Sequence, residues 1–176
     1  MELYRLGVKF FAADPASVSL PDFIPIFHTW IQRQIVDGHL LIDVHNYSHI
    51  HNGPGILLVA HEGNFSIDMA EGRPGLLYYR KQPGADFAAA VQSALRACRL
   101  LEEEPVLKGR LRFRNDELLI IANDRLHAPN NEQTFSELEP LLSSALRQSL
   151  GRSDLTLSRA STNPKDRFAV TVSRAL

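Results

Sequence analysis

Short apolar segments, each closed by a turn signal, constrain this chain more than any other feature of its sequence. Four of them are residues 3–12, 40–47, 55–61 and 76–81. They mix β-branched, aromatic and apolar side chains and are bounded by Gly or Pro, which is typical of β-strands. The link through Gly53-Pro54 is too short for a parallel crossover, so residues 40–47 and 55–61 are predicted to pair antiparallel.

Three other segments carry apolar residues at helical spacing. The first covers residues 23–31, with Asp22 as the predicted N-cap, and the second covers residues 87–101, with Asp86 as the cap. A third helix is predicted to begin after Ser136 and to end at Gly151. Capping by Ser136 places Pro140 at the fourth helical position, where its missing N–H costs least.

Two further strand pairs are predicted. Residues 111–113 and 118–121 flank Asn115-Asp116, a tight hairpin signal. Residues 155–158 and 168–173 are joined through the turn signal Asn163-Pro164, and their alternation predicts one buried face and one exposed face.

The order of these elements predicts an α+β fold: a mostly antiparallel sheet of about seven to eight strands, with three helices packed largely on one face. The first part matches the split β-α-β pattern of ferredoxin-like folds with an extra strand, and the second part matches a partial second unit. The chain has 176 residues and no long linker, so residues 1–176 are predicted to form a single domain.

Composition excludes several classes of protein. Uninterrupted apolar runs such as residues 56–60 are far too short to cross a bilayer, and the first residues enter a strand pattern instead of a leader pattern. Cys98 is the single cysteine and lies on the apolar stripe of its helix, so it is interpreted as a small core residue. We therefore expect a cytoplasmic protein. A net charge of −1 argues against a nucleic-acid partner.

A cluster of histidines between residues 39 and 62 is the one local departure from ordinary composition. The candidate metal ligands are His45, His49, His51, His61 and Glu62. A hairpin centred near Gly53 would bring His45 opposite His61, and imidazole with carboxylate is the ligand set of a transition metal such as zinc. The cluster matches no recognised metal motif, so solvated or hydrogen-bonded histidines are the alternative interpretation.

A second candidate is a row of alternating arginines. Arg110, Arg112 and Arg114 would project from one face of a strand. Such a row suits a small anion or a subunit interface, and a solvated strand edge is the alternative. No aromatic stacking positions interleave with it, so RNA or single-stranded DNA is the weaker interpretation.

No nucleophile, cofactor or metal motif stands out, while several strand faces are half apolar. The leading hypothesis is therefore a non-catalytic binding or assembly module, homo-oligomeric or with a protein partner, that uses exposed sheet faces or edges. A metal-dependent protein centred on the histidines and a small-anion site at the arginine row are the alternatives.

Overall fold

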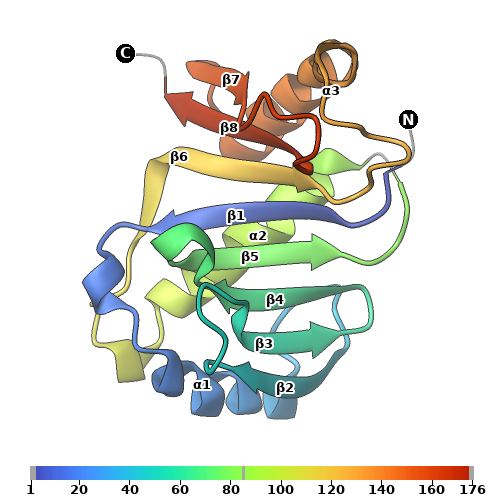
Figure 1. Ribbon diagram of the computed structural model, residues 1–176. Coiled ribbons are helices and arrows are strands. Elements are labelled where there is room, and N and C mark those ends of the chain that lie inside the picture. The colour runs from blue at the N-terminus through green and yellow to red at the C-terminus, as the bar shows by residue number, and fades with distance from the viewer. Residues whose placement is uncertain (1–2, 85, 175–176) are drawn as a thin grey trace.

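The computed structural model describes residues 3–84 and 86–174, and eight strands of this part form one sheet (Figure 1). The strand order is β2-β3-β4-β5-β1-β6-β8-β7, and every neighbouring pair is antiparallel. The strands are β1 (Leu6–Ala12), β2 (Leu41–Tyr47), β3 (Gly55–Ala60), β4 (Gly63–Asp68), β5 (Gly75–Arg80), β6 (Phe113–Ala122), β7 (Leu155–Arg159) and β8 (Phe168–Arg174). The predicted α+β class and antiparallel sheet are confirmed.

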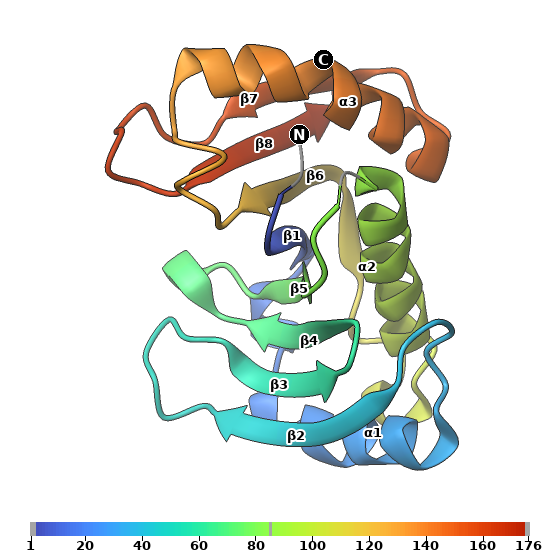
Figure 2. The ribbon, with the colours of Figure 1, turned by 90° about the vertical axis from the view of Figure 1, so that its right-hand side faces the viewer.

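Three α-helices cover one face of this sheet, as predicted. They are α1 (Leu20–Arg33), α2 (Phe87–Glu102) and α3 (Glu132–Leu150), and the chain also contains the short turns η1 (Pro15–Ser17), η2 (Ala70–Gly72) and η3 (Pro105–Leu107). Buried residues of all three helices belong to the same hydrophobic cluster as Val8 and Phe10 of β1. Figure 2 shows α1 and α2 on the same side of the strands.

The predicted hairpin at Asn115-Asp116 is wrong, because β6 is one continuous strand across these residues. Phe10 pairs with Leu118, whereas Ala12 pairs with Phe113. A shift of two residues along β1 therefore corresponds to a shift of five residues along β6. The extra residues form a bulge, where Asn and Asp tolerate the irregular backbone as they would in a turn. Residues 65–69 were predicted only as a short extended piece, but residues 63–68 form the full strand β4. The strand total is therefore still eight.

Two predicted helix starts are also wrong. Asn131 caps α3, because its side chain accepts a hydrogen bond from the Thr134 N–H at 2.8 Å, and Pro140 lies inside the helix. α1 begins at Leu20 after Ser19, so Asp22 lies in its first turn. The cap predicted for α2 is confirmed, since Asp86 accepts from the Ala89 N–H at 2.9 Å. Long helices that pack on a sheet gain tertiary contacts that outweigh an interior proline.

The opposite side of the sheet carries no helix in the part of the chain that the structure describes (Figures 1 and 2). We call it the open face. The η2 turn and the loop between β7 and β8 project from it, one on each side of its centre, and form its walls (Figure 2). Among the described residues, no helix is long and apolar enough to cross a membrane.

Candidate functional site

The open face has a small apolar centre flanked by charged side chains. Because side chains alternate along a strand, Val8 and Phe10 point to the helices and Gly7, Lys9 and Phe11 point to the open face. The centre consists of the buried residues Leu77, Ile121 and Ala169, with Tyr79 and Leu119 packed against them. An apolar patch that no helix covers is a candidate binding surface.

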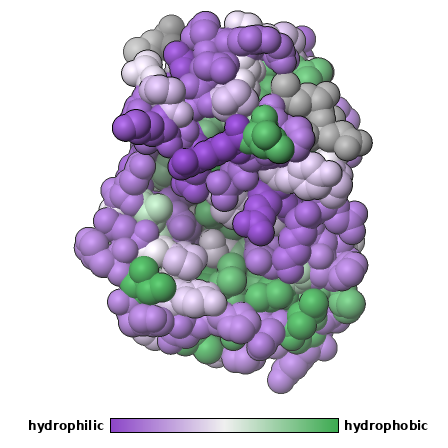
Figure 3. Space-filling view, turned by 45° about the vertical axis from the view of Figure 1, so that its right-hand side comes forward, coloured by the Kyte–Doolittle hydropathy of each residue, from purple (hydrophilic) through white to green (hydrophobic). Residues whose placement is uncertain are grey.

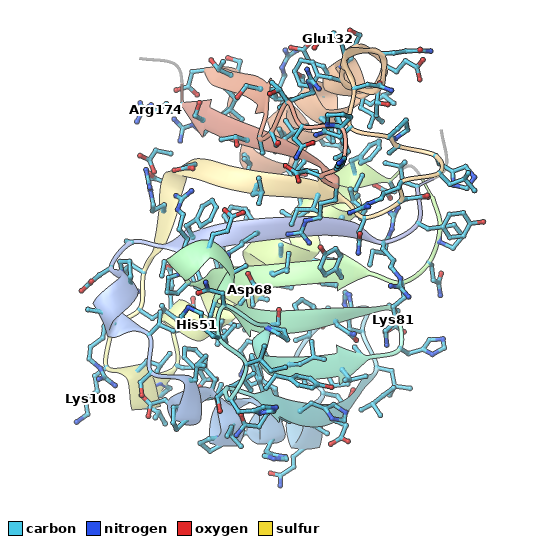
Figure 4. The ribbon with its side chains drawn as sticks, in the orientation of Figure 1. His51, Asp68, Lys81, Lys108, Glu132 and Arg174 are labelled. Atoms are coloured by element: carbon cyan, nitrogen blue, oxygen red, sulfur yellow. The ribbon has the colours of Figure 1, made fainter. Side chains whose placement is uncertain are left out.

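Lys9 is a buried cation in the middle of this face. It is 3% exposed, and its Nζ donates a hydrogen bond to Asp68 Oδ2 at 2.6 Å. Asp68 comes from β4 and also accepts from the Ala70 N–H at 3.2 Å (Figure 4). Burial lowers the pKa of Lys9, and Asp68 acts in the opposite direction. Buried ionisable pairs contribute little net stability. A buried charged side chain such as Lys9 is therefore a candidate functional group.

A second ion pair on this face joins Arg73 to Glu117 of β6. Both terminal nitrogens of Arg73 donate to Glu117 at 2.9 Å, and the guanidinium lies 3.7 Å from the centroid of the Phe11 ring. These hydrogen bonds from Arg73 lower the pKa of Glu117, as does the charge of Arg114, whose Nη1 lies 3.0 Å away. The pairs hold the side chains of this face in fixed positions.

Between these pairs and the β7–β8 loop lies a groove of about 490 Å³, which we call the Lys9 groove. Its floor is formed by Lys9, Phe11, Glu117, Leu119, Ala169 and Thr171. Its walls are formed by Ala70, Glu71, Arg73, Ala160, Ser161, Asp166 and Arg167, with Arg125 at the rim. Its size lies in the range of small-molecule sites, and its lining is polar enough to orient a polar ligand.

Tyr79 and Arg167 separate this groove from a second depression. The Tyr79 ring lies over Gly7, where a Cβ would come within 2.6 Å of the ring. Its hydroxyl accepts a hydrogen bond from Arg167 Nη1 at 3.1 Å, and burial raises its pKa. Only glycine at position 7 allows the ring to lie flat across β1 and reach the β7–β8 loop.

The second depression, the basic pocket, has a volume of about 300 Å³. It is lined by Arg5, Asn64, Tyr79, Arg80, Lys81 and Asn123, three of which are basic residues and none acidic. Lys81 Nζ donates to the Ala60 carbonyl at 2.7 Å, and Arg80 also lines a depression on the helix side of the sheet. Figure 4 shows Lys81 just beyond the end of β5. Arg80 Nε and Asn64 Oδ1 are buried and lack a hydrogen-bond partner among the described residues. Buried polar atoms without a partner are rare in proteins and indicate a missing ligand or water.

The structure does not bring the candidate metal ligands together. His45 lies opposite Leu57 in the β2–β3 register, so the predicted pairing with His61 is wrong. His61 is four positions beyond Leu57, roughly 13 Å along the strand. His49 and His51 lie on the loop after β2, and Glu62 accepts a hydrogen bond from the Leu40 N–H at 2.8 Å. Within residues 3–84 and 86–174, no group of three or more His, Cys, Asp or Glu side chains is placed to hold a metal ion.

The arginine row is also rearranged. Only Arg114 belongs to β6, and the cross-strand partners predicted from a hairpin do not exist. Each guanidinium lies near a carboxylate of this chain: Arg110 is 3.6 Å from Asp22, Arg112 is 3.8 Å from Glu102, and Arg114 is 2.9 Å from Asp116. Arg112 and Arg114 nevertheless line one cleft on the helix side of the sheet, which Arg110 does not reach.

Sequence reasoning missed the open-face residues, although one signal was present. Lys9 is a lone charge within the otherwise apolar run Leu6–Ala12, and such a charge must either face solvent or find a buried partner. Comparison with protein-family models and with curated proteins finds no match for this chain.

Proposed function

We propose that this protein is a non-catalytic binding module that holds a small ligand on its open face, with an oxyanion of the ligand in the basic pocket. The lining of that pocket carries the proposal, because three basic residues, Arg5, Arg80 and Lys81, contribute to it and no acidic residue does. Phosphate and carboxylate groups are the ordinary partners of such a set of donors.

The unpaired atoms of the pocket support the same ligand. The two terminal nitrogens of Arg80 already donate to the carbonyls of Gly84 and Asp86, which leaves Nε buried without an acceptor. A buried donor without a partner costs about 1–3 kcal/mol, and an oxyanion in the pocket would supply the acceptor once the Arg80 side chain turns to expose Nε. Asn64 Oδ1 is unpaired as well, and in the flipped amide its N–H group would face the anion.

The neighbouring Lys9 groove would accommodate the remainder of the ligand. It lies on the other side of the Tyr79–Arg167 contact, and Arg125 and Arg167 at its rim add positive charge next to the basic pocket. The groove also offers acceptors, because Glu71 and Asp166 line its walls. A ligand with one anionic group and several hydroxyl or amide groups matches this distribution.

Thermal denaturation with inorganic pyrophosphate, at constant ionic strength, tests the proposal. At ten times its Kd, pyrophosphate is expected to raise the Tm of the native protein by about 3–6 °C. The Arg5→Gln, Lys81→Gln variant should lose most of this shift, because it removes two of the three cations of the pocket. The matched variant Arg33→Gln, Arg147→Gln changes two exposed helix arginines elsewhere and should keep it. Equal shifts in both variants would contradict the proposal.

Assembly into a homo-oligomer through the start of β2 is the second proposal. Leu40 and Ile42 are 57% and 54% exposed, and Ile35 after α1 is also exposed. Figure 3 shows hydrophobic side chains gathered on the lower right of the molecule. The strand edge itself is protected: a bulge separates Leu41 from Asp43, and the Val44 N–H donates to Asp43 Oδ1 at 2.8 Å. The contact would therefore use side chains and not strand addition.

Light scattering at high protein concentration tests this assembly. The native chain of 19.7 kDa is expected to show a mass of at least two copies. The Leu40→Ser, Ile42→Ser variant should return to the monomer, because it removes the exposed apolar contact. Leu126→Ser is the control, since Leu126 is 83% exposed on a different loop. A monomeric native protein would exclude this proposal.

A ferredoxin-like description of the first part of the fold is supported by one feature of the topology. β1 lies between β5 and β6, and α2 connects these two strands. β3 and β4 add two strands between β2 and β5. α3, β7 and β8 extend the sheet beyond β6, which is the partial second unit of this description.

A further inference from the structure

A cleft of about 470 Å³ opens on the helix side of the sheet, away from the open face. It lies between the second half of α2, the start of β6 and the end of α3. Four arginines, Arg99, Arg112, Arg114 and Arg152, contribute to its lining, and we call it the arginine cleft. It exists because the bulge in β6 carries residues 114–117 away from β1, and α3 ends at Gly151 before it can cover the gap.

One wall of the arginine cleft is apolar. Its apolar lining residues are Phe10, Leu95, Cys98, Phe113, Leu118, Leu150, Leu155 and Val172. Several of them belong to the main hydrophobic core, and burial together with the nearby Glu102 raises the pKa of the Cys98 thiol well above its usual range. The thiol is therefore an uncharged part of the wall. A hydrocarbon chain could lie along this apolar wall. The polar part of the lining consists of the four arginines, Asn115, Ser149 and the carboxylates of Glu102, Asp116 and Glu117.

Two of the four rim arginines are already bound to carboxylates with ideal geometry. Arg114 binds Asp116 through two hydrogen bonds of 2.9 and 3.0 Å. Arg152 binds Asp154 in the same way at 3.0 and 2.9 Å, which lowers the pKa of Asp154 to about 2. These guanidinium groups have little capacity left for a ligand.

The other two rim arginines are available to a ligand. Arg112 is only 3.8 Å from Glu102, whose Oε1 is held by the Phe113 N–H at 2.9 Å. Arg99 has no ion-pair partner within the described part of the chain and lies three residues before Glu102, on the same side of α2. Arg99 and Arg112 therefore line the same cleft as Glu102, and only Arg112 lies within ion-pair distance of that carboxylate.

We propose that the arginine cleft binds an aliphatic carboxylic acid of medium chain length. Its carboxylate takes the place of Glu102 as the partner of Arg112 and also binds Arg99, and its hydrocarbon chain lies along Leu95, Cys98 and Leu150. The volume of the cleft is in the range of small-ligand sites, and the combination of an apolar wall with a few placed charges is typical of them. This site is independent of the basic pocket on the opposite face.

Calorimetry with octanoate tests this site, with acetate as a head-only control and 1-octanol as a tail-only control. Octanoate is expected to bind at least tenfold more tightly than either control. The Arg99→Gln, Arg112→Gln variant should lose about tenfold or more in octanoate affinity, because each charge-assisted hydrogen bond contributes strongly. The matched variant Arg96→Gln removes an arginine of the same helix that lines a different depression, and should bind octanoate normally.

Three further measurements separate this site from non-specific binding and from the basic pocket. Leu95→Trp fills the cleft without changing any charge and should abolish octanoate binding. Octanoate should also slow the reaction of the single thiol, Cys98, with a thiol reagent in the native protein. The Arg5→Gln, Lys81→Gln variant should bind octanoate unchanged. Unaltered binding in both the Leu95→Trp and the double-arginine variant, or equal binding of acetate, would overturn the proposal.

Discussion

Replacing Asp68 with alanine is expected to lower the free energy of unfolding by about 3–5 kcal/mol, measured by urea denaturation. The side chains of Lys9 and Asp68 are only 3% and 9% exposed, and 2.6 Å separates Nζ from Oδ2. Without Asp68 the ammonium group of Lys9 stays buried without its counter-charge. The penalty should shrink as the pH rises towards 10, because burial already lowers the pKa of Lys9 and a neutral amine needs no partner.

Two comparisons make this result specific. The double variant Lys9→Met, Asp68→Leu removes both charges and should recover most of the lost stability, because apolar side chains of similar size replace the pair. Asp116→Ala breaks the exposed contact with Arg114 and should have little effect, since surface ion pairs contribute little. A small loss for Asp68→Ala, similar to that of Asp116→Ala, would show that water reaches Lys9. It would contradict the interpretation of Lys9 as a buried cation that depends on Asp68.

Replacing Trp30 with alanine is the second change expected to have a large effect, a loss of about 3–5 kcal/mol. Trp30 is 1% exposed and packs against Phe27 with ring centroids 5.4 Å apart. Its indole N–H donates to Glu104 Oε1 at 2.7 Å, which joins α1 to the segment after α2 across 74 residues of sequence. Truncation therefore removes both core volume and a link between distant segments.

Trp30→Phe separates these two contributions. The ring remains apolar but cannot donate a hydrogen bond, so the loss should be smaller than that of Trp30→Ala. Glu104→Ala should lower stability by about 1 kcal/mol, the usual contribution of one hydrogen bond. All these losses are measured by urea denaturation monitored by circular dichroism, because the two Trp30 variants lack the tryptophan signal. Equal losses for Trp30→Phe and Trp30→Ala would show that the hydrogen bond outweighs the packing.

Local patterns predicted most of the elements because they report short-range physics. The alternation of residues 155–158 and 168–173 predicted the β7–β8 pair, and Asp86 predicted the start of α2. Where a local signal has two uses the prediction was wrong: Asn115-Asp116 serves a bulge instead of a turn. A prediction from propensity alone cannot tell these uses apart, because β1 provides the partner that keeps β6 extended.

The candidate sites depended on register and on contacts between distant residues. The antiparallel pairing of β2 with β3 was predicted correctly, but the hairpin is centred at His51 and not at Gly53. His45 therefore pairs with Leu57 instead of His61, and the histidines are separated. Lys9 and Asp68 are 59 residues apart in the chain, and Arg167 reaches Tyr79 across 88 residues. No rule of sequence spacing connects such pairs, so the ion pairs and hydrogen bonds of the open face could not be predicted from the sequence.

The sequence by itself determined that this chain forms an antiparallel α+β fold with one buried face on its last hairpin, because hydrophobic periodicity and turn residues act over a few neighbouring positions. Only the tertiary structure decided which charges meet. The order of the strands places β1 between β5 and β6, and this position buries Lys9 and brings Asp68, Arg73 and Glu117 around it. Contacts across strands depend on strand order and register, which are properties of the whole sheet.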